Sequence, residues 1–284
     1  MKQKTNTAWL IGGLFLFSIG MTAGFLWDLP LDIAVHNATW LPAILTESFG
    51  FYPQYLPPIF LFFCFAKTKK LPLWARILLG AIATLGGAAL IVYSGTRLLK
   101  RETPAAGLIL IVFALLFALC CFALLRALRQ TAFLQKATFI CAWGTVYLLV
   151  STLVINVLKL IWNRTRFDDM LALGDFSNFT AWIHPFGMGG SSFPSGHVAA
   201  ACSIFILILC CDVFPFFAKH RTMFWSISWA YIAWMALCRI VIGRHYLSDT
   251  VMAAFVMTVL FFAMTRNVIY RNSLNTLRNQ TQVQ

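Results

Sequence analysis

Between Ala105 and Leu125 the chain reads AAGLILIVFALLFALCCFALL, 21 positions without a charged side chain. About 20 apolar residues in a helix are enough to cross the roughly 30 Å hydrocarbon core of a bilayer. This run therefore predicts a transmembrane helix.

The composition of the whole chain agrees with this interpretation. Hydrophobic residues make up 60% of the 284 residues and charged residues 11%, whereas ordinary soluble domains carry roughly 25% charged residues. The mean hydropathy is +0.79. A soluble globule of this length cannot hide so much apolar surface behind so few charges, so we predict a membrane protein.

The excess of basic residues, 22 Lys and Arg against 9 Asp and Glu, does not predict a nucleic-acid partner. Nucleic-acid binding needs a basic stripe on a solvated face, whereas these bases lie singly or in small clusters between apolar runs. The eight cysteines fall within apolar stretches without metal-ligand spacing, so we interpret them as small hydrophobic residues. We predict neither a metal ion nor another cofactor.

Eight segments are long and apolar enough to be spans, which predicts an all-α, polytopic transmembrane helix bundle. They run approximately from Ala8 to Trp27, Tyr52 to Ala66, Ile77 to Thr96, Ala105 to Leu125, Ala137 to Leu158, His197 to Phe217, Thr222 to Ile242 and Leu247 to Thr265. The second is the weakest, because it is short and contains three prolines. Residues 1–284 are predicted to form a single integral membrane domain, in which residues 272–284 are a polar cytoplasmic tail.

The positions of Lys and Arg predict the orientation, because cytoplasmic loops are enriched in them. If the N-terminus is inside, 14 of the 22 basic residues lie on the cytoplasmic side. Eight spans then place both termini in the cytoplasm, and the long segments Leu29–Phe51 and Leu160–Phe193 outside it. We predict a multi-pass protein of the cell (inner) membrane.

Three polar breaks in the apolar pattern carry candidate chemistry, and all are predicted on the extracytoplasmic side. In the first, Lys159 and Arg166 are seven residues apart at the end of the fifth run. On a continuing helix they would lie on nearly the same face, where both reach one anion. The alternative is that Lys159, Arg164 and Arg166 only extend to lipid headgroups at the interface.

The second break is Pro194-Ser195-Gly196-His197, immediately before an apolar run. A proline near a helix start, a serine cap and a glycine leave backbone N–H groups pointing outward, and such a helix N-terminus binds phosphate-like anions. His197 stands beside that predicted anion site. The alternative is a plain helix cap with an interfacial histidine.

The third break contains Arg239, His245 and Asp249. Arg239 lies inside the outer end of an apolar run, where an unpaired cation costs about 2.5–3.5 kcal/mol at the bilayer centre, so it requires a partner or a ligand. His245 and Asp249 are four residues apart, so the carboxylate can accept from one ring nitrogen and orient the other. An oriented neutral imidazole is a nucleophile or a base. The alternative is a purely structural His–Asp pair.

Together these residues resemble the signature of the type 2 phosphatidic acid phosphatase superfamily, the lipid phosphate phosphatases that share a core with vanadium haloperoxidases. The family pattern is Lys-x6-Arg-Pro, then Pro-Ser-Gly-His, then Ser-Arg-x5-His-x3-Asp, and residues 159–249 follow it in order. Phe167 stands in place of the usual Pro and Cys238 in place of the usual Ser, which bears on the loop after Arg166 and on a hydroxyl that supports the phosphate site. The usual core has six spans, so the resemblance implies a six-span phosphatase core with extra N-terminal helices.

The resemblance implies metal-independent hydrolysis of a membrane lipid phosphate or diphosphate, of the isoprenoid or glycerolipid type. His245 would be the nucleophile and form a phosphohistidine, and Asp249 would hold its tautomer. His197 would protonate the leaving oxygen and later activate water. The phosphate contacts would come from Lys159, Arg166, Ser195, Gly196 and Arg239.

Other functions remain compatible with the sequence. They are a lipid-to-lipid phosphotransferase and a catalytically silent membrane scaffold that binds lipid; a transporter is disfavoured because no chain of charges crosses the middle of the membrane.

The connecting segment Phe167–Phe193 is either a lid or a loop anchored by its aromatic residues, and we favour anchoring. Undecaprenyl diphosphate, phosphatidic acid, phosphatidylglycerol phosphate and lipid A all present a phosphate to the same site, and neither the choice among them nor the oligomeric state follows from the sequence.

Overall fold

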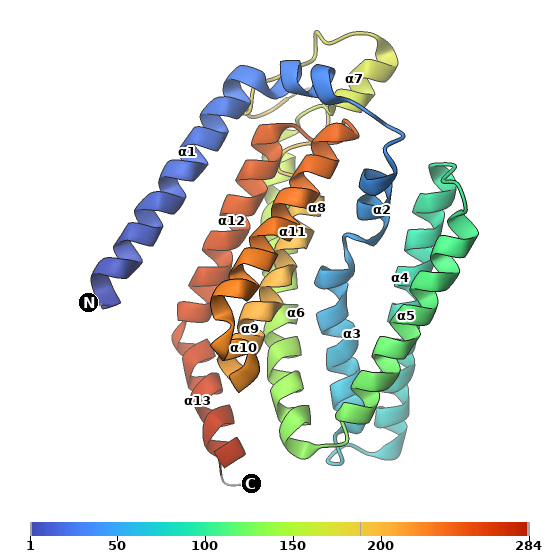
Figure 1. Cartoon of the computed structure of the whole chain (residues 1–284), viewed down its shortest axis with the longest axis vertical. Helices are drawn as coiled ribbons and strands as arrows, with labels where there is room; N and C mark the ends of the chain where they lie inside the picture. Colours follow the sequence, from blue (N-terminus) through green and yellow to red (C-terminus); the bar gives the residue numbers. More distant parts are fainter. Residues whose placement is uncertain (1, 188, 283–284) are drawn as a thin grey trace.

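The computed structural model describes residues 2–187 and 189–282, and the side chains of residues 12–187 and 189–280. It is 80% helical and contains no strand among the described residues (Figure 1). Eight of its helical segments are long and apolar enough to cross a membrane, which confirms the all-α polytopic bundle. In chain order the α-helices are α1 (Lys2–Val35), α2 (Leu41–Phe49), α3 (Tyr52–Lys67), α4 (Leu73–Lys100), α5 (Ala106–Ala127), α6 (Thr131–Trp162), α7 (Phe167–Leu173), α8 (Gly196–Ala201), α9 (Ile206–Val213), α10 (Pro215–Lys219), α11 (Arg221–Val241), α12 (Leu247–Arg266) and α13 (Val268–Gln282).

The second span is longer than the sequence predicts. α2 and α3 follow one another with a break only at residues 50–51, and together they give a candidate span from Leu41 to Lys67. The segment Leu29–Phe51, which the sequence predicts to be an extracytoplasmic connection, therefore overlaps this candidate span at α2, and α2 packs against α4 and α11. Glu47 and Ser48 interrupt the apolar pattern of α2, but both are buried among neighbouring helices.

The uninterrupted apolar run between residues 105 and 125 forms α5, and none of the residues of α5 is buried. Its long side chains, such as Leu108 and Leu119, are more than half exposed on the outside of the bundle. The position of α5 explains its composition, because a helix surrounded by hydrocarbon needs apolar residues on every exposed face.

The interior of the bundle is built from the second half of the chain. Phe205, Ile208, Met257 and Phe261 belong to one apolar cluster to which α6, α9, α11, α12 and α13 contribute. The chain from Gly196 to Val213 crosses this region as one candidate span, with a 3-10 turn between α8 and α9. This packing fixes the first residues of α8, which carry the second motif, and the first turn of α12, which carries Asp249 of the third motif.

The C-terminal segment is a docked helix, where the sequence predicts a polar tail. Tyr270, Leu274 and Leu277 of α13 are buried, and the Tyr270 hydroxyl donates to Asp212 Oδ2 at 2.6 Å. The apolar residues of this segment are spaced so that one face of the helix meets the core, a pattern that its many polar residues conceal. The last two residues of the predicted tail lie outside the described part of the chain.

Candidate active site

A cavity of about 270 Å³ lies where the three motifs meet. Five of its lining side chains are cations and one is a carboxylate, so it suits an anionic ligand. Within the described residues, no three His, Cys, Asp or Glu side chains are grouped to hold a metal ion. The lining residues are Glu47, Phe51, Arg97, Lys159, Arg166, Gly196, His197, Arg239, Arg244 and His245.

Lys159 and Arg166 reach the cavity by a different path from the one predicted. α6 ends at Trp162 because Asn163 adopts a left-handed conformation (φ 46°), so no continuous helix carries both cations. They converge instead on Ser191: the Lys159 ammonium donates to its carbonyl oxygen, and Arg166 Nη2 donates to its hydroxyl at 2.8 Å. Both side chains line the cavity, so the structure brings these two residues together as the motif predicts.

Ser195 caps α8 as predicted, but its amide has a partner within the protein. The Ser195 hydroxyl accepts from the Val198 amide at 3.4 Å, and Gly196 lines the cavity. The Ser195 amide donates to the Asp249 carbonyl oxygen at 3.0 Å, so this N–H is not free to bind a phosphate oxygen. The predicted phosphate contact from the Ser195 amide is corrected accordingly: Ser195 joins the start of α8 to α12.

His197 lies in the first turn of α8 and faces the cavity. Its ring packs against Phe51, with the ring centroids 4.3 Å apart. Its Nε2 atom is buried and has no hydrogen-bond partner among the described residues. Buried polar atoms of folded proteins are normally paired. A buried ring nitrogen that has no partner inside the protein is therefore available to bind a ligand.

His245 lies in the short link between α11 and α12. Its Nδ1 atom is 2.7 Å from the Ser192 carbonyl oxygen, which can only accept, so Nδ1 carries the proton and Nε2 keeps its lone pair. Asp249 Oδ2 lies 3.5 Å from the same nitrogen. Ser192 makes the shorter contact and therefore orients the ring more directly than Asp249 does. The sequence predicted Asp249 as the only orienting residue.

The environment keeps the His245 ring neutral. Burial lowers the pKa of His245 to about 3; the neighbouring Asp249 opposes this shift, and the positive charges of Lys159 and Arg239 add to it. At pH 7 the imidazole is therefore uncharged, with Nε2 as its nucleophilic atom.

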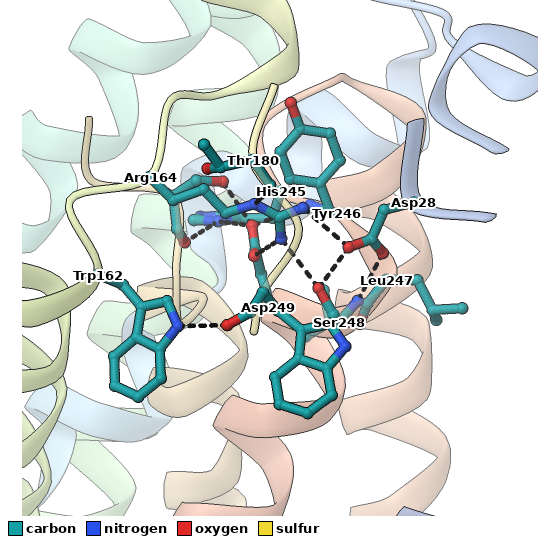
Figure 2. Close-up of polar contacts among 12 residues, drawn as sticks. Asp28, Trp162, Arg164, Thr180, His245, Tyr246, Leu247, Ser248 and Asp249 are labelled. Atoms are coloured by element: carbon teal, nitrogen blue, oxygen red, sulfur yellow. Dashed lines mark hydrogen bonds and ion pairs between the residues drawn. The ribbon is translucent and has the colours of Figure 1, made fainter. Parts of the chain in front are cut away.

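Asp249 is held by a buried arginine. The side chain of Arg164 is 1% exposed; it donates from Nη1 to Asp249 Oδ1 at 2.7 Å and from Nη2 to Asp28 Oδ2 at 2.9 Å (Figure 2). The Tyr246 ring covers the guanidinium at 4.0 Å, and the Tyr246 amide donates to Asp249 Oδ2 at 3.0 Å. The alternative in which Arg164 extends to headgroups is wrong, because both of its carboxylate partners lie inside the protein.

Arg239 has the partner that its position requires. Its Nη1 atom is 3.1 Å from Glu47 Oε1, and the other oxygen of Glu47 is 3.0 Å from Arg101 Nη2. Glu47 is buried and comes from α2, outside every motif. The only sequence signal for Glu47 is a single acidic residue ahead of an apolar run, and sequence reasoning missed it.

The two departures from the family pattern lie away from the cavity lining. The Cys238 thiol donates to Thr46 Oγ1 at 3.5 Å, and Cys238 is fully buried. The buried Phe167 ring stacks on Phe176, with the ring centroids 5.6 Å apart. Both side chains therefore act in packing between segments.

The loop between α7 and α8 is anchored at several points. Trp162 Nε1 donates to the Trp182 carbonyl at 2.5 Å, and Arg164 Nε donates to the Thr180 carbonyl at 2.7 Å. Trp182 Nε1 in turn donates to the Met21 carbonyl at 2.9 Å. These bonds tie the loop to α6 and α1, which supports the anchored interpretation over a lid.

Comparison with known proteins matches the second half of the chain to one family. The sequence pattern of the PAP2 superfamily matches residues 141–273, whereas searches of curated proteins and of solved structures found no match. The matched region contains all three motifs, while Asp28, Glu47 and Arg97 precede it. Residues 141–273 are therefore a region of the PAP2 superfamily, and together with the eight candidate spans this match supports a multi-pass membrane protein of the phosphatase type.

Proposed function

We propose that the protein hydrolyses the phosphate or diphosphate group of an isoprenoid lipid or glycerolipid, at the extracytoplasmic face of a cell membrane, through a phosphohistidine intermediate. The observation that supports this best is the state of His245, which is neutral, oriented through Nδ1 and part of the lining of a cationic cavity. A phosphate group bound in this cavity would contact both a nucleophile and the cations that neutralise the phosphate charge.

The cations would bind the substrate before the reaction begins. Lys159, Arg166 and Arg239 line the cavity and would surround the non-bridging oxygens, with Gly196 at the start of α8 contributing a backbone N–H. As the phosphoryl group moves from oxygen to nitrogen, negative charge spreads over its three equatorial oxygens. Cations that are already in place stabilise this charge without reorganising.

The two histidines would divide the chemical steps. His245 Nε2 would attack phosphorus in line as the bond to the lipid oxygen breaks, and the positive charge on its ring would be shared with the Ser192 carbonyl and Asp249. His197 would donate a proton from its ring to the leaving lipid oxygen. The neutral His197 would then accept a proton from water as this water attacks phosphorus and the bond between phosphorus and His245 Nε2 breaks. Release of phosphate returns both histidines to their starting states.

Two further cations favour a diphosphate within the proposed substrate class. Arg97 comes from the last turn of α4, and Arg244 comes from the link before α12, where it pairs with Asp168 at 2.8 Å. Both line the cavity beyond the three cations of the motifs. These additional positive charges suit a headgroup with a second phosphoryl group, since each phosphoryl group adds negative charge to be neutralised.

Phosphate release from purified lipids tests the proposal. Undecaprenyl diphosphate, phosphatidic acid, phosphatidylglycerol phosphate and lipid A form the panel. A phosphatase releases one inorganic phosphate for each bond broken, whereas a lipid-to-lipid phosphotransferase consumes the donor lipid only when an acceptor lipid is present. A protein that neither releases nor transfers phosphate from any member would be a silent scaffold, and the proposal would fail.

Activity is expected to survive EDTA and to be blocked by vanadate. The neutralising charge comes from Lys159, Arg166 and Arg239, and a trigonal-bipyramidal vanadate resembles the transition state. The measurement is phosphate release in detergent with each reagent, with an untreated sample as control. Loss of turnover on chelation that a divalent ion restores would contradict this expectation.

The site is expected to face away from the cytoplasm. Ser177→Cys places a thiol at an exposed position of the loop before α8, and Ala218→Cys places one at an exposed position of α10. In a background without native cysteines, a membrane-impermeant thiol reagent should label the first variant in intact cells or spheroplasts, and should label the second only after lysis, because the distribution of basic residues places α10 inside. The reverse pattern would place the site in the cytoplasm.

A further inference from the structure

The side of α1 that faces α12 carries two glycines followed by two carboxylates at intervals of four residues: Gly20, Gly24, Asp28 and Asp32. A Cβ atom on Gly24 would lie 2.7 Å from the Ser248 Cβ atom, so only a glycine allows this approach. The close contact continues along the helices and brings the side chain of Asp28 to the first turn of α12.

Both carboxylate oxygens of Asp28 accept hydrogen bonds at the first turn of α12. One of its oxygens accepts from the Ser248 amide at 2.9 Å, and the other accepts from the Ser248 hydroxyl at 2.5 Å and from Arg164 Nη2 at 2.9 Å (Figure 2). The side chains of Asp28 and Arg164 are each 1% exposed. Pairing of charges at this depth is needed, because a buried charge without a partner is strongly destabilising.

Arg164 joins Asp28 to the catalytic carboxylate. Its Nη2 atom binds Asp28 and its Nη1 atom binds Asp249, which itself lies 3.5 Å from His245 Nδ1. The guanidinium is therefore shared between two carboxylates. If Asp28 were absent, the whole positive charge of Arg164 would act on Asp249 and would cancel more of its negative charge.

We propose that Asp28 is a positioning residue for the reaction at His245: by sharing Arg164 it keeps Asp249 in place and preserves the negative charge that stabilises the His245 ring when this ring becomes positive. The inference rests on the proposed function, in which His245 is the nucleophile. It makes α1, which lies outside residues 141–273, part of the machinery that the family region needs. Asp28 does not line the cavity, so it acts on the chemical step and leaves substrate binding unchanged.

Replacing each of two aspartates of α1 by asparagine tests the proposed role of Asp28. Asp28→Asn should lower kcat and the rate of phosphoenzyme formation about 10- to 100-fold, the range seen when an outer-shell partner of a metal-binding histidine is removed, with KM unchanged. Asp28→Glu, which keeps the carboxylate, should recover part of that rate. Asp32→Asn is the matched comparison: Asp32 is buried one turn further along α1 and neither of its oxygens has a hydrogen-bond partner among the described residues, so it does not hold Arg164, and kcat should fall much less than in Asp28→Asn.

A second pair leaves every ionic group in place and applies if Asp28→Asn does not fold. Gly24→Ala pushes α1 away from Ser248 and should lower the rate of phosphoenzyme formation, whereas Gly13→Ala, where an added Cβ meets no atom within 4 Å, should not. Wild-type rates in Asp28→Asn, or a change in KM alone, overturn the inference. When Asp28→Asn does not fold, a wild-type rate in Gly24→Ala overturns it. Failure of the proposed function looks different, because then the wild-type protein releases no phosphate or His245→Ala still does.

Discussion

His245→Ala is expected to abolish both turnover and the acid-labile phosphoenzyme. The Nε2 atom of His245 is the only group assigned to bond formation with phosphorus, and its lone pair is free because Nδ1 carries the proton. Lipid phosphate hydrolysis and acid-quenched trapping of labelled phosphoenzyme are the two measurements. A variant that still forms phosphoenzyme at the normal rate would show that another residue is the nucleophile.

His197→Ala removes a different step and should give a different defect. Loss of leaving-group protonation and of water activation should lower turnover on the order of 10²- to 10⁴-fold, as for other general acid–base groups. An aryl phosphate needs little protonation of its leaving group, so this variant should still be phosphorylated slowly and should accumulate the intermediate. If His197→Ala forms no phosphoenzyme with such a substrate while His245→Ala does, the two roles are reversed.

Asp249→Asn is expected to lower turnover less than His245→Ala does. The Ser192 carbonyl remains to hold Nδ1 of His245, so the tautomer is kept and only the negative charge beside the ring is lost. Its defect should therefore resemble that of His245→Ala but be weaker. Thermal unfolding in detergent, measured on each variant, separates lost chemistry from lost folding.

Arg164→Leu is expected to destabilise the protein on the order of 3–5 kcal/mol, the cost of removing one partner from a buried ion pair. Asp28 and Asp249 would then both be buried without their shared cation. The measurement is the free energy of unfolding from denaturant titration in mixed micelles. Adding Asp28→Asn to Arg164→Leu should recover part of the loss, because one of the two unpaired carboxylates is then neutral.

An exposed ion pair provides the control for this comparison. Arg221 contacts Asp212 at 2.7 Å, but its side chain is 46% exposed. Arg221→Leu should change the free energy of unfolding by about 0–1 kcal/mol, as for other surface pairs. Equal stability of the Arg164 and Arg221 variants would mean that the buried network contributes nothing to folding.

The spans and the motifs are predictable from the sequence because each depends on a local pattern. Apolar length alone gives the eight spans, and the spacing of four between His245 and Asp249 brings these residues together whatever surrounds them. The end of α6 also has a local cause, since asparagine tolerates the left-handed conformation that Asn163 adopts. The presence of Asn163 is a signal that the continuous-helix prediction overlooked.

The partners of the charged residues are not predictable in the same way, because they depend on which helices become neighbours. At the end of an apolar run, Arg164 has the same sequence environment whether it meets a headgroup or two buried carboxylates. Asp28 and Glu47 look like ordinary polar interruptions until α1 packs on α12 and α2 packs on α11. For the same reason, the sequence suggested a free amide at Ser195, although the neighbouring α12 occupies it.

The contact between Asp28 and Ser248 joins positions 220 residues apart, in the first and the last of the eight candidate spans. During synthesis, α1 therefore enters the bilayer long before the groups that complete its polar bonds exist. An aspartate near the middle of a spanning helix opposes insertion by about 2.5–3.5 kcal/mol, and near an end by less. We therefore expect the final docking of α1 to wait until Arg164 and α12 have been synthesised, which makes it a late step of biogenesis. A chain that stops before α12 lacks Asp249 and leaves α1 without its partner, so the site is completed only when the last span is in place.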